Sequence, residues 1–248
     1  MTSIAHSNIA MWSGPRNIST AMMYSFGNRA DCVAWDEPFY AAYLLQSGLN
    51  HPMREEIIAA GQKNKNDNIW QATEAACTNK SNKPIFYQKH MTHHMLPVFD
   101  RKNLLSAVTN AFLIRSPEKV LASYAKKHDE VSLHAIGFVE QAEIFDAVAQ
   151  NLGHAPPVID ADQFLDSPEE KLKNLCAALN IPFDPAMLHW PNGPKSFDGV
   201  WAPHWYNAVW QSTGFEKPRS KLVALESYNQ QVADAARPYY EKLKAFAL

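Results

Sequence analysis

The stretch Ile9-Ala10-Met11-Trp12-Ser13-Gly14-Pro15-Arg16-Asn17-Ile18-Ser19-Thr20 decides the fold. Its first four residues have the length and composition of a short buried strand, and the Gly-Pro pair that follows indicates a tight turn. Ser19 and Thr20 place hydroxyl groups at the expected start of a helix. A helix N-terminus presents N–H groups without intrahelical acceptors and therefore favours an anion such as phosphate or sulfate. The stretch predicts a strand, an anion-binding turn and a helix; a merely capped helix, with Arg16 as a surface charge, is the plain alternative.

The composition is that of an ordinary globular protein. The chain has 248 residues, of which 46% are hydrophobic and 19% charged, so it can bury the core of one large domain. We expect a single domain over residues 1–248. The formal net charge of -2 favours neither nucleic acid nor an anionic membrane as a partner, so any anion must be held by local groups.

Cysteine usage and the N-terminal residues predict a cytoplasmic protein. Cys32, Cys77 and Cys176 lie far apart and form no CxxC motif, which argues against a disulfide framework or a cysteine zinc site. The first residues lack the basic segment and apolar run of a signal peptide, and no apolar run approaches the ~18 residues of a membrane span. Nothing in the sequence specifies an oligomeric state.

Five short apolar runs predict the strands of a parallel sheet. They alternate with segments long enough for helices, and this alternation predicts an α/β fold with helices on both faces of the sheet. The expected strands are Ile9–Trp12, Cys32–Trp35, Ile85–Gln88, Ala111–Ile114 and Val158–Asp160.

Proline and serine mark the starts of two helices. Ser116-Pro117 and Ser167-Pro168 each place a capping serine before a proline at the first helical position. Glu170 completes the capping-box pattern of the second. A last helix is expected over 222–246, and Pro238 predicts a kink or a break within it.

A second segment carries a cation at the end of a strand. In Ala111-Phe112-Leu113-Ile114-Arg115-Ser116-Pro117 the apolar run ends at Arg115, and Ser123 lies eight residues later on the following helix. Both side chains can reach an anion beyond the carboxyl end of the strand, which is where ligands of open α/β sheets bind.

Together the two segments resemble the paired signatures of the sulfotransferase family, which uses 3′-phosphoadenosine 5′-phosphosulfate. Val158–Leu165 and Ser167–Phe183 are similar to the late strand and following helix of that family, so the resemblance covers most of residues 9–195. It implies a P-loop NTPase-like fold with a central parallel sheet. It also implies transfer of a sulfuryl group to a hydroxyl or amine of a small-molecule acceptor, without a metal.

The resemblance implies which residues hold the donor. Arg16 is placed on the phosphosulfate bridge, and Arg115 with Ser123 on the 3′-phosphate. Ile18 stands where the family usually has Gly, so a backbone conformation with positive φ would be strained there. The residues implied for the first loop are Gly14, Pro15, Arg16, Asn17, Ile18, Ser19 and Thr20.

Histidines after the third strand are candidates for the catalytic base. A base must take the proton of the acceptor, and histidine suits this near neutral pH. Many family members have Lys-x-His here, but Met91 stands at the expected histidine position. Lys89 is expected to stabilise charge on the leaving phosphate. The candidate bases are, in order, His93, His90 and His94. The same histidines have partial metal-ligand spacing, although no nearby cysteine or paired carboxylate completes a site; hydrogen bonds at a helix start are a third interpretation.

Asp36-Glu37-Pro38-Phe39-Tyr40 supplies a further candidate base, Glu37. Some bacterial relatives resemble this chain in having a glutamate here. Desolvation by the neighbouring aromatic rings would raise the pKa of Glu37. An acidic turn before Pro38 is the structural alternative.

Residues 181–218 are rich in Pro and Trp and predict an irregular lid packed over the sheet. Trp201-Ala202-Pro203-His204-Trp205-Tyr206 would stack on adenine, line the acceptor pocket or simply fill the core. Three nearby cations, Lys195, Lys217 and Arg219, are further candidates for the 3′-phosphate.

Two other functions use the same residues. A nucleotide-binding P-loop kinase or NTPase is the first, but the loop lacks the GxxxxGK[ST] pattern, and no Asp after an apolar strand is suited to Mg²⁺. A non-catalytic nucleotide-binding module of the same fold is the second, and Ile18 with the altered histidine spacing motivates it.

Overall fold

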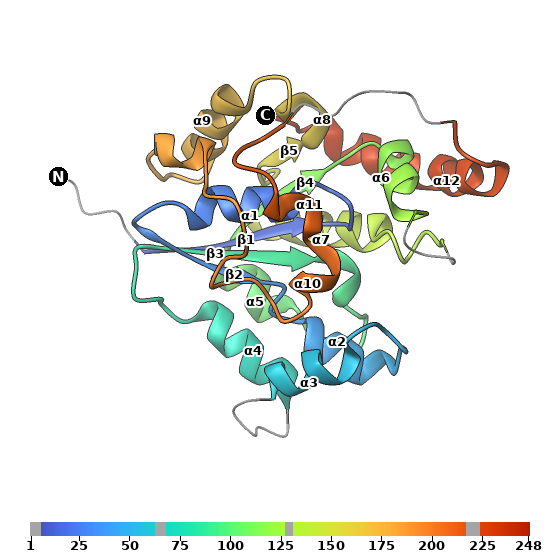
Figure 1. The fold of residues 1–248 in the computed structure, drawn as a ribbon, viewed down its shortest axis with the longest axis horizontal. Coiled ribbons are helices and arrows are strands. Elements are labelled where there is room, and N and C mark those ends of the chain that lie inside the picture. Colours follow the sequence, from blue (N-terminus) through green and yellow to red (C-terminus); the bar gives the residue numbers. More distant parts are fainter. Residues whose placement is uncertain (1–5, 63–67, 127–130, 217–223) are drawn as a thin grey trace.

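A five-stranded parallel sheet runs through the middle of the protein (Figure 1). The computed structural model describes residues 6–62, 68–126, 131–216 and 224–248. All five predicted strands are confirmed, and each predicted run lies within the observed strand. The strands are β1 (Ser7–Ser13), β2 (Cys32–Asp36), β3 (Ile85–Met91), β4 (Thr109–Ile114) and β5 (Val158–Asp160).

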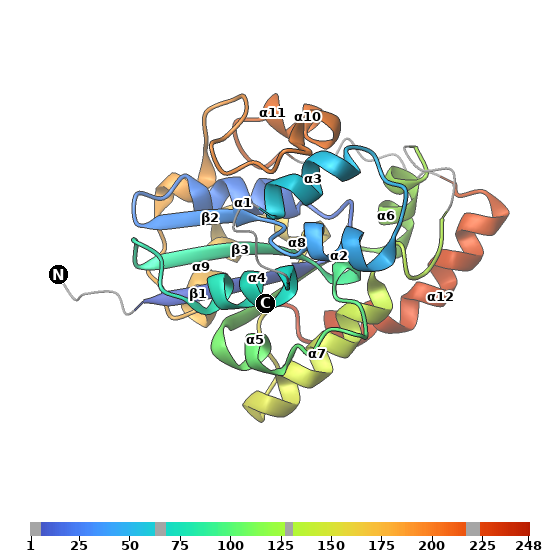
Figure 2. The same cartoon turned by 90° about the horizontal axis from the view of Figure 1, so that it is seen from below.

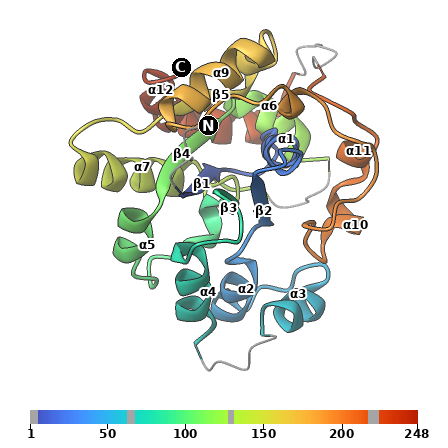
Figure 3. The same cartoon turned by 90° about the vertical axis from the view of Figure 1, so that its left-hand side faces the viewer.

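Helices cover both faces of this sheet (Figures 2 and 3). In Figure 3, α1 and α9 lie on one side of the strands, and α5 and α7 lie on the other. The helices are α1 (Ser19–Gly27), α2 (Tyr40–Ser47), α3 (Arg54–Gly61), α4 (Ile69–Thr78), α5 (Lys102–Ala107), α6 (Pro117–Tyr124), α7 (Phe138–Leu152), α8 (Ala161–Phe164), α9 (Pro168–Ala178), α10 (Ala202–Trp205), α11 (Asn207–Trp210) and α12 (Ser227–Lys244), with the 3₁₀ turns η1 (Thr92–His94) and η2 (Pro185–Leu188).

The central strand shows why both faces are covered. Successive side chains of a strand point to opposite faces. Ile9 and Met11 of β1 belong to one apolar cluster, whereas Ala10 and Trp12 belong to another. All four are fully buried, so the continuous apolar run produces a strand with a core on each side.

The strand order brings the predicted anion-binding segments together. The order is β2-β3-β1-β4-β5, so the chain leaves β1 toward β2 on one side and leaves β4 toward β5 on the other. The crevice outside the carboxyl ends of β1 and β4 is therefore the topological switch point, where ligands of open parallel sheets bind. The turn 14–18 follows β1 at this edge, and Arg115 follows β4.

Both predicted helix starts are confirmed, but neither serine caps its helix. Pro117 and Pro168 occupy the first turns of α6 and α9, and the side chains of Ser116 and Ser167 make no capping hydrogen bond. Ser116 Oγ instead donates to Asp162 Oδ2 at 2.8 Å. Ser116 therefore bonds to a residue distant in sequence instead of accepting a bond from the first turn of α6. The ring of Pro117 defines the start of that helix.

The predicted break at Pro238 is wrong, because α12 continues through it from Ser227 to Lys244, and the alternative of a kink there stays a prediction. Pro238 lies on the exposed side of the helix. The carbonyl that loses its partner can therefore be hydrated. Ala236 before the proline and Tyr240 after it are both buried, so the helix packs against the rest of the protein on either side of Pro238. Residues 222 and 223 of the predicted helix lie outside the described residues.

Replacing Pro238 with Ala is expected to raise the free energy of unfolding by about 1–3 kcal/mol, because alanine restores an intrahelical N–H donor and relieves the ring clash. Urea denaturation, monitored by circular dichroism, measures the free energy of unfolding. Gln231→Ala, at another exposed position of α12, is the matched control and should change stability by only a few tenths of a kcal/mol. A Pro238→Ala variant no more stable than the parent would show that the proline fits this helix without cost.

The segment expected to form a lid, called the lid below, has little regular structure in its described part. Its described residues, 181–216, contain only η2, α10 and α11 as helical segments. Trp190, Trp201 and Tyr206 are buried and belong to the apolar cluster that also contains side chains of α1. The lid therefore closes one side of the switch-point edge. In the described ranges, none of the helices combines the length and apolar character that a bilayer span requires.

Candidate functional site

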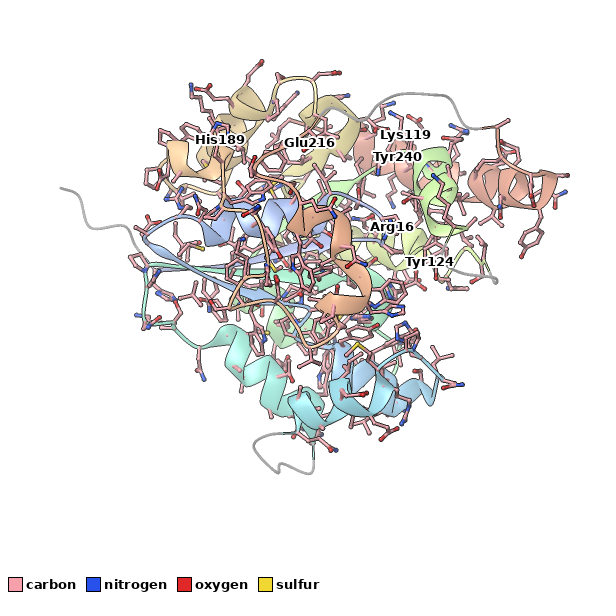
Figure 4. The ribbon with its side chains drawn as sticks, viewed as in Figure 1. Arg16, Lys119, Tyr124, His189, Glu216 and Tyr240 are labelled. Carbon is pink, nitrogen blue, oxygen red and sulfur yellow. The ribbon has the colours of Figure 1, made fainter. Side chains whose placement is uncertain are left out.

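A cavity of about 370 Å³ lies at the carboxyl edge of the sheet. Arg16 and Tyr124, which both line it, lie beside each other where the strand arrows end in Figure 4. Gly14 and His90 are outside its lining. The predicted site residues that line it are Pro15, Arg16, Asn17, Ile18, Ser19, Thr20, Glu37, Lys89, His93, His94, Arg115 and Ser123.

The first loop places its strain at Arg16 rather than at Ile18. Arg16 has φ of 60°, in the left-handed region, whereas Ile18 has φ of -60° and precedes α1 as its N-cap. The expected strain at Ile18 is therefore absent, and a glycine is not needed there. Gly14 has a different reason to lack a side chain: a Cβ would lie 2.5 Å from the carbonyl oxygen of Ile136.

Asn17 fastens the loop to the neighbouring strand. Its Nδ2 donates to the carbonyl oxygen of Leu113 in β4 at 2.9 Å, and the side chain is buried. The first N–H groups of α1, which begins two residues later, have no intrahelical acceptors. The loop is thus held at the switch point with a helix N-terminus directed toward the cavity, a suitable arrangement for an anion.

Two arginines lie close together in this cavity. Arg16 Nε donates to Ser123 Oγ at 2.9 Å, and Arg115 Nη1 donates to the carbonyl oxygen of Arg16 at 3.0 Å. Burial, and then the positive charge of Arg115, lower the pKa of Arg16. Among the described residues Arg115 Nε has no hydrogen-bond partner, and Asp162 Oδ1 is 3.7 Å away. An anion would relieve the repulsion and accept the unused proton, so these residues fit a phosphate.

A second charged group lies at the ends of β2 and β3. Lys89 stands opposite Asp36 in the register of the two strands, and Lys89 Nζ donates to Asp36 Oδ1 at 2.9 Å. It also donates to Glu37 Oε1 at 2.6 Å and to the hydroxyl of Tyr206 at 2.7 Å. The ammonium and the Asp36 carboxylate are almost entirely shielded from solvent, with 2% and 1% of their side chains exposed.

Glu37 has the properties of a base. Burial raises its pKa to about 7, with Asp36 adding to the rise and Lys89 opposing it. Its backbone has φ of 39°, and its N–H donates to the carbonyl oxygen of Lys89 at 2.9 Å. A left-handed glutamate is costly and is found where the surroundings hold it in place. The strained turn directs the carboxylate back onto Lys89 at the cavity.

His90 lies in the core of the protein rather than in the cavity. It stacks on Trp12 with the ring centroids 4.5 Å apart, and its Nε2 is 3.1 Å from Gln88 Oε1. Burial lowers its pKa to about 3. This placement gives His90 a packing role, because it is kept neutral and is separated from any acceptor in the cavity.

The remaining histidines are on η1. His94 is buried and stacks on Tyr40 and Tyr43 with centroid distances of 4.5 and 4.7 Å, and burial keeps its pKa well below the ordinary value. His93 is half-buried and lines the cavity. His94 lines the cavity too, but its low pKa makes it a weak base. Glu37 and His93 therefore remain the candidate bases at the cavity. The described part of the chain holds no group of three or more His, Cys, Asp or Glu that could bind a metal ion.

Sequence reasoning did not assign roles to two members of the charged group, Asp36 of β2 and Tyr206 of the lid. The only sequence signal for Tyr206 is its place in the aromatic run. Trp201 and Trp205 line the cavity as well as packing in the lid. Lys195 instead donates to backbone carbonyls of the 191–193 turn. Lys217 and Arg219 lie outside the described residues.

The fold and the cavity together define an α/β protein of the P-loop-like class, with a turn after its first strand that lines the cavity. A family model described as a sulfotransferase domain matches residues 7–247, and the chain belongs to this family. The likeness deduced from the two arginine-bearing segments is thereby confirmed.

Solved structures share the fold. A sulfotransferase domain from the curacin biosynthetic pathway superposes with a TM-score of 0.54 at 16% identity, covering 95% of this chain and 99% of the other. A sulfotransferase from Alicyclobacillus acidocaldarius gives a TM-score of 0.53 at 9% identity, covering 98% and 96%. At these identities the likeness establishes the arrangement of helices and strands.

Two curated proteins of Arabidopsis thaliana are closer in sequence. They are named branched-chain-amino-acid aminotransferase-like protein 1 and protein 2, and they are 35% and 34% identical to this chain over 96% and 95% of its length. The chain spans 41% of each relative.

Proposed function

We propose that this protein transfers a sulfuryl group from 3′-phosphoadenosine 5′-phosphosulfate to a hydroxyl or amine of a small molecule. The observation that carries the proposal is the placement of the Arg16–Ser123–Arg115 cluster and of Glu37 in one cavity at the switch point. An anion cradle beside a potential base is what in-line group transfer requires.

Arg16, Arg115 and Ser123 would bind two different phosphate groups of the donor. Arg16 and the N–H groups at the start of α1 would hold the phosphosulfate end, where negative charge develops on the departing phosphate. Arg115 and Ser123 would hold the 3′-phosphate. When bound, the donor supplies the activated sulfuryl group. The unused Nε proton of Arg115 and the mutual repulsion of the two guanidinium groups support this division.

Glu37 is the proposed base. Its carboxylate takes the proton from the acceptor while the acceptor oxygen or nitrogen forms a bond to sulfur. The bond from sulfur to the bridging phosphate oxygen breaks, and its electron pair remains on that oxygen. The proximity of the pKa of Glu37 to neutrality suits general base catalysis. His93 is the rival, because it also lines the cavity.

The names of the plant relatives raise amino transfer as another activity. A lysine that forms a Schiff base with a carbonyl must first lose its proton. Burial lowers the pKa of Lys89, but Asp36 and Glu37 raise it well above the ordinary value and keep the ammonium charged. The site therefore supports sulfuryl transfer better than amino transfer.

We also propose that residues 1–248 act as one domain in the cytoplasm. The family match over 7–247 supports the first statement. Three free, buried thiols, Cys32, Cys77 and Cys176, support the second, because oxidising compartments favour disulfides.

The direct test is calorimetric titration of the protein with adenosine 3′,5′-bisphosphate, followed by transfer assays with ³⁵S-labelled donor and a panel of alcohols, phenols and amines. We expect bisphosphate binding without Mg²⁺ and label transfer to at least one acceptor. Absence of bisphosphate binding would overturn the donor assignment. Binding without transfer to any acceptor would support the non-catalytic module, and Mg²⁺-dependent ATP binding would support a kinase or NTPase.

A further inference from the structure

The ammonium of Lys89 has no proton left for a ligand. A protonated lysine has three N–H donors. Asp36 Oδ1, Glu37 Oε1 and the hydroxyl of Tyr206 lie 2.9, 2.6 and 2.7 Å from Nζ, so each donor has an acceptor within the protein. The expectation that Lys89 stabilises the leaving phosphate would require one of these bonds to break.

Asp36 is satisfied just as completely. Its Oδ2 accepts from the hydroxyl of Tyr206 at 2.7 Å and from the N–H of Gly199 at 3.1 Å. Tyr206 in turn accepts from Trp201 Nε1 at 3.3 Å. The two donors to Asp36 Oδ2, Gly199 and Tyr206, both belong to the lid. The lid therefore holds the Asp36 carboxylate in place beside Lys89.

We propose that Asp36 is a positioning residue that neutralises Lys89 and so leaves Glu37 as the member of the group that gains and loses the proton. The inference rests on the proposed function in one respect, namely that the proton gained by Glu37 comes from the acceptor. Lys89 acts in this arrangement as a fixed counter-ion beside the base rather than as a ligand of the departing phosphate.

The balance of charge supports this assignment. Both oxygens of Asp36 accept hydrogen bonds, as a carboxylate does, and Lys89 Nζ donates three, as an ammonium does. Such a pair has no net charge, so the charge of the group is -1 or 0 according to the state of Glu37. If Asp36 were absent, Lys89 would pair with Glu37 alone and would favour its ionised, weakly basic form. Burial strengthens both effects because the interior screens charge poorly.

The other titratable side chains that contact or neighbour Glu37 are neutral. On η1, His94 Nε2 lies 3.9 Å from Glu37 Oε2, but burial keeps that imidazole neutral. On α2 and in the lid, Tyr40 and Tyr206 have pKa values raised by burial above the ordinary value, so both remain neutral. The charges that act on Glu37 are therefore those of Asp36 and Lys89, in opposite directions.

Carbon-13 NMR titration of the glutamate side chains tests the inference without any need for turnover. The Glu37 carboxyl signal is assigned by its loss in Glu37→Gln. We expect Asp36→Asn to move the midpoint of the Glu37 titration to lower pH by roughly one unit, and Lys89→Met to move it to higher pH. Opposite shifts from two variants of one hydrogen-bonded group are not produced by general loosening of the structure.

Tyr24→Phe is the matched control. Tyr24 donates to Asp198 Oδ2 at 2.8 Å and ties the same lid to α1, but it does not line the cavity. Its removal should leave the midpoint at the parent value. An unchanged or higher midpoint in Asp36→Asn would overturn the inference, and Lys89→Met gives an independent answer if Asp36→Asn does not fold. Failure of the proposed function would appear separately, as absent bisphosphate binding by the parent.

Discussion

The Glu37→Gln variant is expected to lose about 10²- to 10⁴-fold in the rate of sulfuryl transfer while keeping its affinity for adenosine 3′,5′-bisphosphate. Glutamine occupies nearly the same volume and can still accept a bond from Lys89, but it cannot take a proton. Single-turnover transfer of ³⁵S label to the acceptor found by screening measures the rate, and calorimetry measures the affinity.

The pH dependence of the same reaction gives a second readout. Glu37 acts in its ionised form, so kcat/KM should rise with pH through the pKa of about 7 and then level off. The rise should disappear in Glu37→Gln. His93→Gln is the matched control, because His93 lines the same cavity. If His93→Gln suffers the larger loss and Glu37→Gln retains the parent rate, the base is His93.

The Arg115→Ala variant is expected to bind adenosine 3′,5′-bisphosphate about 100-fold more weakly than the parent, because it loses charge-assisted hydrogen bonds of roughly 1.5–3 kcal/mol each. Ser123→Ala should lose less affinity for the bisphosphate, because Arg115 remains. The parent affinity should also fall as salt is added, because the contact is ionic.

Arg237→Ala controls for the loss of a positive charge. Arg237 pairs with Glu118 on α6, the helix that also carries Ser123, but it does not line the cavity. The affinity of the Arg237→Ala variant for the bisphosphate should match that of the parent. Circular dichroism establishes that Arg115→Ala is folded. Equal affinities of folded Arg115→Ala and the parent would remove Arg115 from the donor site.

The strands and the two segments proposed to bind an anion were predictable because they depend on local patterns. Each apolar run became a buried strand, and parallel strands necessarily place their carboxyl ends at one edge. The turn at 14–18 and Arg115 then had to meet if β1 and β4 were neighbours, as they are. The break expected at Pro238 is wrong because packing on both sides of the proline outweighs its low helix propensity.

For a similar reason, sequence spacing could not separate His90 from His93. His90 and His93 are three positions apart and carry the same imidazole, but His90 is the last-but-one residue of a fully buried strand, whereas His93 is on η1. Sequence spacing alone does not say where β3 ends. The boundary between strand and turn decides that one ring stacks on Trp12 and the other borders the cavity.

The sequence by itself therefore determined the class of fold, the five strands and the two arginine-bearing segments that line the cavity, because hydrophobic periodicity and turn residues act locally. Only the tertiary structure decided the group around Lys89, whose bonds to Asp36 and Tyr206 join residues 53 and 117 positions apart. Such contacts depend on strand order, register and the path of the lid, and a residue pattern within one segment does not encode them.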